Sequence, residues 1–142
     1  MAPRPEHDAF LPELVRTFYD ALAGFEKETG VHLARWRILS MLAEAKKSSQ
    51  RSLAKSSHID PASISRILRE LEVAGHVTRE SDPSDSRQSL AMLTISGKAL
   101  VREIAKNRAK FLRKALKGVT PDKVKQVTEA LHSIRQNLAN LR

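Results

Sequence analysis

Arginine and serine side chains gather on one face of a helix predicted for residues 60–73. Around a small residue, this face carries two serines and two arginines: Ala62, Ser63, Ser65, Arg66 and Arg69. Arginine donates hydrogen bonds to phosphates and guanine edges, and serine hydroxyls bind phosphates or bases. The small Ala62 lets the helix approach a surface closely. The available chemistry is therefore nucleic-acid recognition, although an ordinary solvated face is an equally good interpretation of this helix alone.

Local signals indicate where this helix begins, where it ends and which side it buries. Asp60 is a good N-cap, and Pro61 suits the first helical position, where a missing N–H has no cost. Gly75 supplies the helix stop. The apolar residues at i, i+3, i+4 and i+7 form one stripe: Ile64, Ile67, Leu68 and Leu71. This stripe is expected to face the core and so turn the arginines outward.

A shorter helix, predicted for residues 50–56, comes directly before the turn at residues 57–59. Helix, tight turn and second helix make the helix-turn-helix layout, in which the second helix enters the major groove of DNA. Three residues at the start of the shorter helix lie where free N–H groups favour a phosphate: Ser49, Gln50 and Arg51. Both helices together are therefore predicted to contact nucleic acid.

A β-hairpin is predicted after Gly75, because the hydrophobic period changes there. Residues 76–79 and 89–93 read as strands, and the polar segment at residues 80–88 reads as a long hairpin tip. Arg87 is the only basic residue between Arg79 and Lys98. An arginine on a thin tip can enter a narrow minor groove. Asp85 is expected to hold an arginine or the loop backbone in shape, and an ordinary polar hairpin is the alternative.

The charge of the chain is uneven. The net charge is +9 over 142 residues. Residues 1–45 hold five Lys/Arg and seven Asp/Glu, a net of −2, so residues 46–142 carry the remaining twenty and nine, a net of +11. Such a concentration of positive charge favours a polyanionic partner over a merely basic protein or one that binds anionic membranes.

Several classes of function lack residues to support them. The chain has no cysteine, which excludes disulfides and thiol chemistry. No Gly-rich phosphate loop or Ser-His-Asp arrangement is present, and the five histidines lack metal-ligand spacing, so we expect neither an enzyme nor a bound metal or cofactor. With no apolar run of about 20 residues and no signal-peptide core, we expect a cytoplasmic location.

With these features, the chain resembles the MarR family of winged-helix transcription regulators. The resemblance rests on residues in register across the helix pair, the strand after it, the hairpin tip and its exit: Ser49, Leu53, Ala54, Ile59, Ser63, Ser65, Arg66, Leu68, Leu71, Gly75, His76, Val77, Arg79, residues 82–87, Leu93, Thr94 and Gly97. One departure is Ser86, which stands where the family often has the first of two arginines; Arg87 matches the second. By the resemblance, the hairpin is a wing, and Asp85, Ser86 and Arg87 belong to the DNA-binding surface.

The remaining helices flank this region. After a frayed tail at residues 1–7, helices are predicted at residues 8–29, 33–45, 94–117 and 121–142, with a basic loop at residues 46–49 and Ile95 facing inward. The last helix has apolar residues in alternating steps of three and four, as in a coiled-coil seam. Intramolecular packing is one interpretation of this seam. The resemblance implies a homodimer joined by both terminal helices, with contacts at Leu11, Leu14, Phe18, Val127, Leu131, Ile134 and Leu138.

The predicted fold class is mainly α with a small β-hairpin wing. It is a winged helix-turn-helix (residues 33–96) flanked by an N-terminal dimerisation helix (residues 1–32) and C-terminal dimerisation helices (residues 97–142), in one compact domain. The resemblance also implies a pocket for small aromatic acids, bordered by Phe18, Tyr19, His32, Arg35 and Trp36. An equally good interpretation is that Phe18 and Trp36 are plain core residues and that Arg35 lies on the surface.

The expected function is a sequence-specific regulator of transcription that binds double-stranded DNA. We expect a homodimeric repressor on a pseudo-palindromic operator, released by a small effector such as an aromatic acid. Two alternatives remain. One is a sequence-independent nucleoid or RNA-binding protein that uses the basic residues 95–117, and the other is a protein-interaction module built on the heptad seam.

Overall fold

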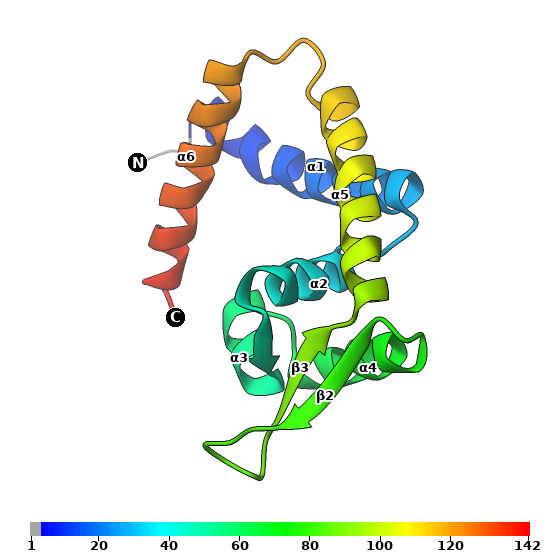
Figure 1. Ribbon diagram of the computed structural model, residues 1–142. Helices are drawn as coiled ribbons and strands as arrows, with labels where there is room; N and C mark the ends of the chain where they lie inside the picture. The colour runs from blue at the N-terminus through cyan, green and yellow to red at the C-terminus, as the bar shows by residue number, and fades with distance from the viewer. Residues whose placement is uncertain (1–3) are drawn as a thin grey trace.

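The computed structural model describes residues 4–142, which form six helices and one small antiparallel sheet (Figure 1). In chain order the elements are α1 (Pro5–Thr29), α2 (Leu33–Ala45), β1 (Lys47–Ser49), α3 (Gln50–Ser57), α4 (Pro61–Val73), β2 (Val77–Ser81), β3 (Ser89–Leu93), α5 (Ile95–Ala115) and α6 (Pro121–Ala139). The strand order is β1-β3-β2. The predicted mainly helical class with a hairpin wing is confirmed. Within residues 4–142 no helix is both long and apolar enough to span a membrane.

The hydrophobic core lies in the winged part of the molecule. Buried apolar side chains come from α2, α3, α4, both hairpin strands, α5 and the end of α1: Phe25, Ile38, Leu39, Leu42, Leu53, Ile64, Ile67, Leu68, Leu71, Val77, Ala91 and Ile104. The predicted stripe of α4 supplies four of these, and α6 supplies none. The core therefore positions the helix-turn-helix and leaves the last helix outside.

Side-chain caps begin four of the helices. The side chains of Ser49, Asp60, Thr94 and Thr120 accept hydrogen bonds from backbone N–H groups three residues later. Each such cap satisfies a donor that has no partner within its helix. Gly30 ends α1 at φ 76°, a conformation that glycine adopts without strain. These local signals explain why most helix starts are readable in the sequence.

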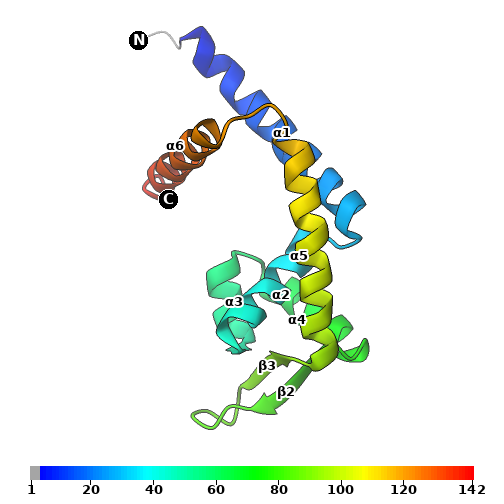
Figure 2. The ribbon, with the colours of Figure 1, turned by 45° about the horizontal axis from the view of Figure 1, so that its top comes forward.

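The C-terminal end of helix α1 packs against α5. The ring of Phe25 packs edge-on against Phe111 of α5, with centroids 6.0 Å apart, and Lys114 Nζ lies 2.8 Å from Glu28 Oε1. Figures 1 and 2 show α1 crossing α5, whereas α6 stands apart after a connecting loop and runs back along the molecule. The apolar residues in the N-terminal half of α1 and in α6 are therefore exposed or half-buried.

Several predicted boundaries are wrong. Helix α1 starts at Pro5, so the tail expected at residues 1–7 is helical from there, and its first three residues lie outside the described part of the chain. The basic loop at residues 46–49 contains strand β1, which pairs with β3. The first hairpin strand covers Val77–Ser81, and α6 ends at Ala139. Ile95 is 87% exposed rather than inward, because Gly97 occupies the buried position at the start of α5.

The start of α5 is packed tightly against the turn after α4. Thr94 donates its hydroxyl hydrogen to the carbonyl of Gly75 (2.7 Å), and its backbone N–H bonds to the carbonyl of His76. A methyl group on Gly97 would lie only 2.0 Å from that His76 oxygen. Only glycine fits this close approach of two backbones.

We expect Gly97→Ala to destabilise the fold by about 1–3 kcal/mol, the usual cost of forcing an extra carbon into a packed site. Urea unfolding followed by circular dichroism measures the change. The matched control Ala99→Ser, at an exposed position of the same helix, should change stability by less than about 0.5 kcal/mol. An unchanged unfolding midpoint for Gly97→Ala would show that the two backbones separate without cost.

Candidate nucleic-acid interface

Helix α4 turns its polar face away from the core. Its four apolar stripe residues are at most 4% exposed. On the opposite side Ala62, Arg66 and Arg69 are exposed, and Ser63 and Ser65 are partly exposed. Arg69 has no ion pair with any residue from 4 to 142. The predicted outward set is therefore on one accessible surface, with a free guanidinium in the middle of the helix.

The first turn of α4 is held by Asp60. Its carboxylate accepts hydrogen bonds from the backbone N–H of Ser63 (2.9 Å) and from the Ser63 hydroxyl (2.6 Å). The hydrogen bond from the Ser63 side chain, followed by that from its backbone, lowers the pKa of Asp60. A serine hydroxyl has a single hydrogen, so in this geometry Ser63 can accept from a base amino group but cannot donate to a phosphate.

Glu70 lies near two arginines, one on its own helix and one on α2. Its Oε2 forms an ion pair with Arg35 of α2, and its Oε1 lies 3.7 Å from Arg66 Nη1. Arg35 is half-buried, so this pair ties α2 to α4. Arg66 is mostly exposed, and its long contact is an ordinary surface pair of small energy. Arg66 therefore remains available to a ligand.

The start of α3 faces the base of the hairpin. Ser49 caps the helix, while the Gln50 amide oxygen accepts a hydrogen bond from Arg79 Nη1 (2.8 Å). Arg79 Nε also lies 3.0 Å from Glu72 Oε2, so this arginine joins α3, β2 and α4. Gln50 is thus a link within the fold, whereas Arg51 is exposed. A cavity of about 280 Å³ separates the first turn of α3 from the hairpin and is lined by Ser49, Gln50, Arg51, Arg87, Gln88 and Ser89.

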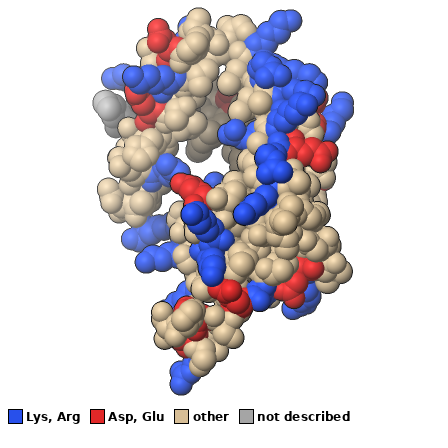
Figure 3. All heavy atoms as spheres, viewed as in Figure 1, with Lys and Arg blue, Asp and Glu red and all other residues tan. Residues whose placement is uncertain are grey.

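The hairpin tip is shaped by two aspartates. Asp85 Oδ1 accepts a hydrogen bond from the Arg87 backbone N–H (3.0 Å), and Asp82 Oδ1 accepts one from that of Ser84 (2.9 Å). The predicted role of Asp85 in holding the loop backbone matches this contact. Asp85, Ser86 and Arg87 are all exposed. Figure 3 shows basic atoms at the far end of the hairpin and along α5.

The residues predicted to border a pocket are divided between three places. His32 and Arg35 line a cavity of about 440 Å³ between α1, α2 and α4, together with Leu22, Glu26, Leu33, Ala34, Arg66 and Ile67. Phe18 and Tyr19 lie outside it, exposed on α1, with their rings edge-on at 5.6 Å. Trp36 packs against the core. The sequence gives no sign that Arg66 belongs to both this cavity and the outward face of α4.

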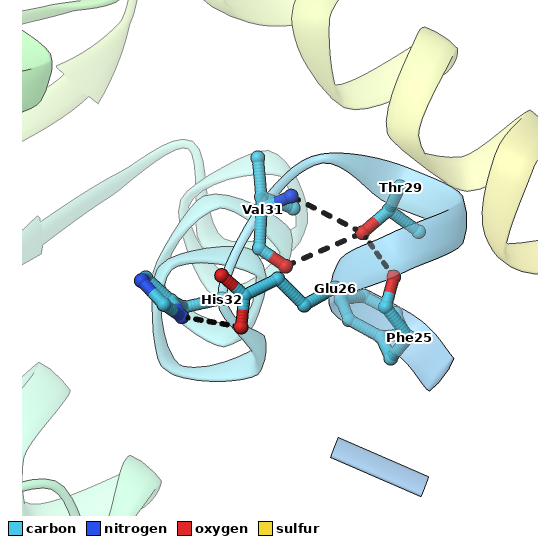
Figure 4. A network of polar contacts seen from close by, with 5 residues as sticks. All are labelled: Phe25, Glu26, Thr29, Val31 and His32. Carbon is cyan, nitrogen blue, oxygen red and sulfur yellow. Dashed lines mark hydrogen bonds and ion pairs between the residues drawn. The ribbon is translucent and has the colours of Figure 1, made fainter. Parts of the chain in front are cut away.

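The end of α1 closes one side of this cavity. His32 Nδ1 lies 3.0 Å from Glu26 Oε2 (Figure 4). Nearby, Thr29 Oγ1 donates to the Phe25 carbonyl (2.7 Å) and accepts from the Val31 N–H (3.3 Å). These contacts fix the turn between α1 and α2, so His32 stands at the cavity edge with its carboxylate partner.

The residues predicted for dimer contacts are exposed or half-buried in the single chain. Leu11, Val127 and Leu138 are 63%, 56% and 55% exposed. Leu14 of α1 faces Leu131, Ile134 and Leu138 of α6 across an open cavity of about 840 Å³. The apolar seam therefore finds little partner surface within the single chain.

The fold and this surface define a winged helix-turn-helix protein. The model of the MarR family matches residues 31–89. The chain is similar to YdgJ, an uncharacterised HTH-type transcriptional regulator of Bacillus subtilis, at 32% identity over 117 residues, covering 82% of this chain and 71% of YdgJ.

Two solved structures share the fold. Sco3205, a MarR-family transcriptional regulator from Streptomyces coelicolor solved in complex with DNA, superposes with a TM-score of 0.86 at 24% identity, over 96% of this chain and 94% of its own. BpsR of Bordetella bronchiseptica, whose DNA binding is regulated by 6-hydroxynicotinic acid, superposes with a TM-score of 0.78 at 22% identity, over 88% and 98%. The chain belongs to the MarR family of winged-helix transcriptional regulators.

Proposed function

We propose that this protein is a homodimeric repressor that binds a pseudo-palindromic operator in double-stranded DNA. The observation that carries the proposal is the orientation of α4, whose apolar stripe is buried and whose serines and arginines face outward. The structure of Sco3205 with DNA and the net charge of +11 over residues 46–142 support the choice of partner.

The exposed residues of this surface suit different parts of DNA. Arg66 and Arg69, which are exposed on α4, suit base edges in the major groove, as does the partly exposed Ser65, and Ala62 allows close approach. Arg51 and the first turn of α3 suit a phosphate. Arg87 on the hairpin suits the minor groove, while Ser86 cannot supply the charge of the arginine often found there in the family.

A second copy is the natural cover for the exposed seam of α1 and α6. Burying Leu11, Val127, Leu131 and Leu138 would remove apolar surface from water at roughly 25 cal/mol per Å². A two-fold dimer then presents two α4 helices, which suit half-sites about one helical turn apart. A dimer on such an operator obstructs transcription by occupying the DNA and needs no further contact.

We expect Arg66→Ala and Arg69→Ala each to weaken operator binding by about tenfold or more, since one base contact contributes about 1–3 kcal/mol. Arg87→Ala should also weaken binding, and it should lower the salt dependence of the affinity by about one released counterion, because one positive charge is lost from the minor groove. Fluorescence anisotropy measures both on a duplex that wild-type protein protects upstream of its own gene. Arg113→Ala, at an exposed arginine of α5, is the control. Equal losses on operator and random DNA would favour sequence-independent binding instead.

We expect Leu131→Glu to convert the dimer to monomer at micromolar concentration, because two carboxylates would enter the apolar seam. Sedimentation equilibrium measures the mass, and circular dichroism checks the fold, which should survive because α6 contributes no buried residue. Val73→Glu places the same charge at an apolar residue that is 85% exposed outside the seam. A monomeric wild type, or a dimeric Leu131→Glu, would rule out this interface.

The cavity beside His32, Arg35 and Arg66 is proposed as the effector site. Regulation of BpsR by 6-hydroxynicotinic acid supports an aromatic acid as the ligand class. A carboxylate there would compete with Glu70 for Arg35 and Arg66, because both guanidinium groups already serve one carboxylate. Drawing Arg66 toward the cavity would remove a base-reading side chain from DNA.

We expect benzoate or 6-hydroxynicotinate to release the operator, and the neutral benzamide not to do so. Arg35→Gln should raise the concentration needed for release by about tenfold, the loss of one charge-assisted contact. The control Arg37→Gln changes an exposed arginine two residues further along α2. Release by benzamide, or an equal response of both variants, would count against this site.

A further inference from the structure

A further groove lies on the winged part of the molecule, between α2, β1, β3 and the first half of α5. Its volume is about 550 Å³, within the range of small-molecule sites. Apolar side chains form its floor and four basic side chains stand around it: Leu42, Ala43, Met92, Leu93 and Val101, with Lys46, Lys47, Lys98 and Arg102. No residue of α4 or of the hairpin tip lines it.

The basic residues of this groove are mostly free. Lys47 lies 2.5 Å from Glu80. Lys46, Lys98 and Arg102 are exposed, and within residues 4–142 none of them has an ion pair. No carboxylate lines the groove. Three uncompensated cations beside an apolar floor favour an anion that also carries apolar surface.

The backbone at the groove edge is strained. Lys46 ends α2 at φ 66° and ψ −52°, a conformation that non-glycine residues rarely adopt. Such strain persists only where the surrounding structure holds it, and it concentrates at ligand sites and switches. It brings Lys46 to the edge of the groove, directly before the strand that leads into α3.

We propose that this groove binds a small amphipathic carboxylate, with its apolar chain on Met92, Leu93 and Val101 and its carboxylate between Lys98 and Arg102. The floor favours this ligand over a nucleic-acid backbone, which has no apolar surface to bury there. The size of the groove favours a molecule of about ten to fifteen heavy atoms over a protein helix. The site is separate from the surface proposed for DNA, so either assignment can fail alone.

Methionine methyl NMR on the full-length protein tests the proposal. The chain has three methionines, of which Met92 lines the groove and Met41 packs against the core. Titration with decanoate below its micellar concentration should shift the Met92 methyl resonance to saturation and leave that of Met41 in place. Decanol, which has the same chain without the charge, should shift it much less. An unmoved Met92, a joint shift of both methyls, or equal binding of decanol would overturn the proposal.

Charge-matched variants locate the carboxylate. The pair Lys98→Gln and Arg102→Gln should raise the dissociation constant for decanoate about tenfold or more, because charge-assisted hydrogen bonds are lost. Lys106→Gln with Lys110→Gln removes the same charge from exposed positions further along α5, outside the groove, and should change binding less than about twofold. Equal weakening by both pairs would show general attraction to a basic helix and refute a built site.

Discussion

Burial of the apolar stripe on α4 is the interaction on which the rest of this structure depends. Ile64, Ile67, Leu68 and Leu71 are at most 4% exposed, and each such side chain contributes roughly 1.5–3 kcal/mol when buried. Rolling the helix about its axis would expose this stripe. The same burial therefore sets the outward direction of Arg66 and Arg69, while the Arg79 contacts to Gln50 and Glu72 hold α3, α4 and the hairpin in one frame.

The winged region buries its apolar side chains within the single chain, whereas α1 and α6 leave many of theirs exposed. The winged region has a closed core, to which α1 contributes only Phe25 and α6 nothing. Apolar side chains on α1 and α6 stay accessible, which is costly for a chain in water unless another surface covers them. In the proposed dimer, α1 and α6 of both copies would cover each other's apolar side chains. The paired helices would then set the distance between the two winged regions.

The features readable from sequence are those with local causes. Asp60 and Pro61 mark the start of α4, and the four apolar residues of its stripe show which side is buried. The polar segment at residues 80–88 predicts the hairpin. Strand β1 escaped prediction because Lys-Ser-Ser has no strand pattern and exists only by pairing with β3. Contacts between distant residues, such as Arg35 with Glu70 and Arg79 with Gln50, also leave no local signal. Because such long-range packing is not visible in the sequence, the five predicted pocket residues lie in three different places in the structure. The groove beside Met92 could not be predicted either.

Selection from a library of random duplexes tests whether the wild-type protein recognises a specific DNA sequence with two symmetry-related α4 helices. Two α4 helices in a two-fold dimer should enrich duplexes that carry inverted half-sites with centres about 10 base pairs apart. Recovery of duplexes without a shared sequence, or with a single half-site and no inverted copy, would contradict sequence-specific binding by a two-fold dimer.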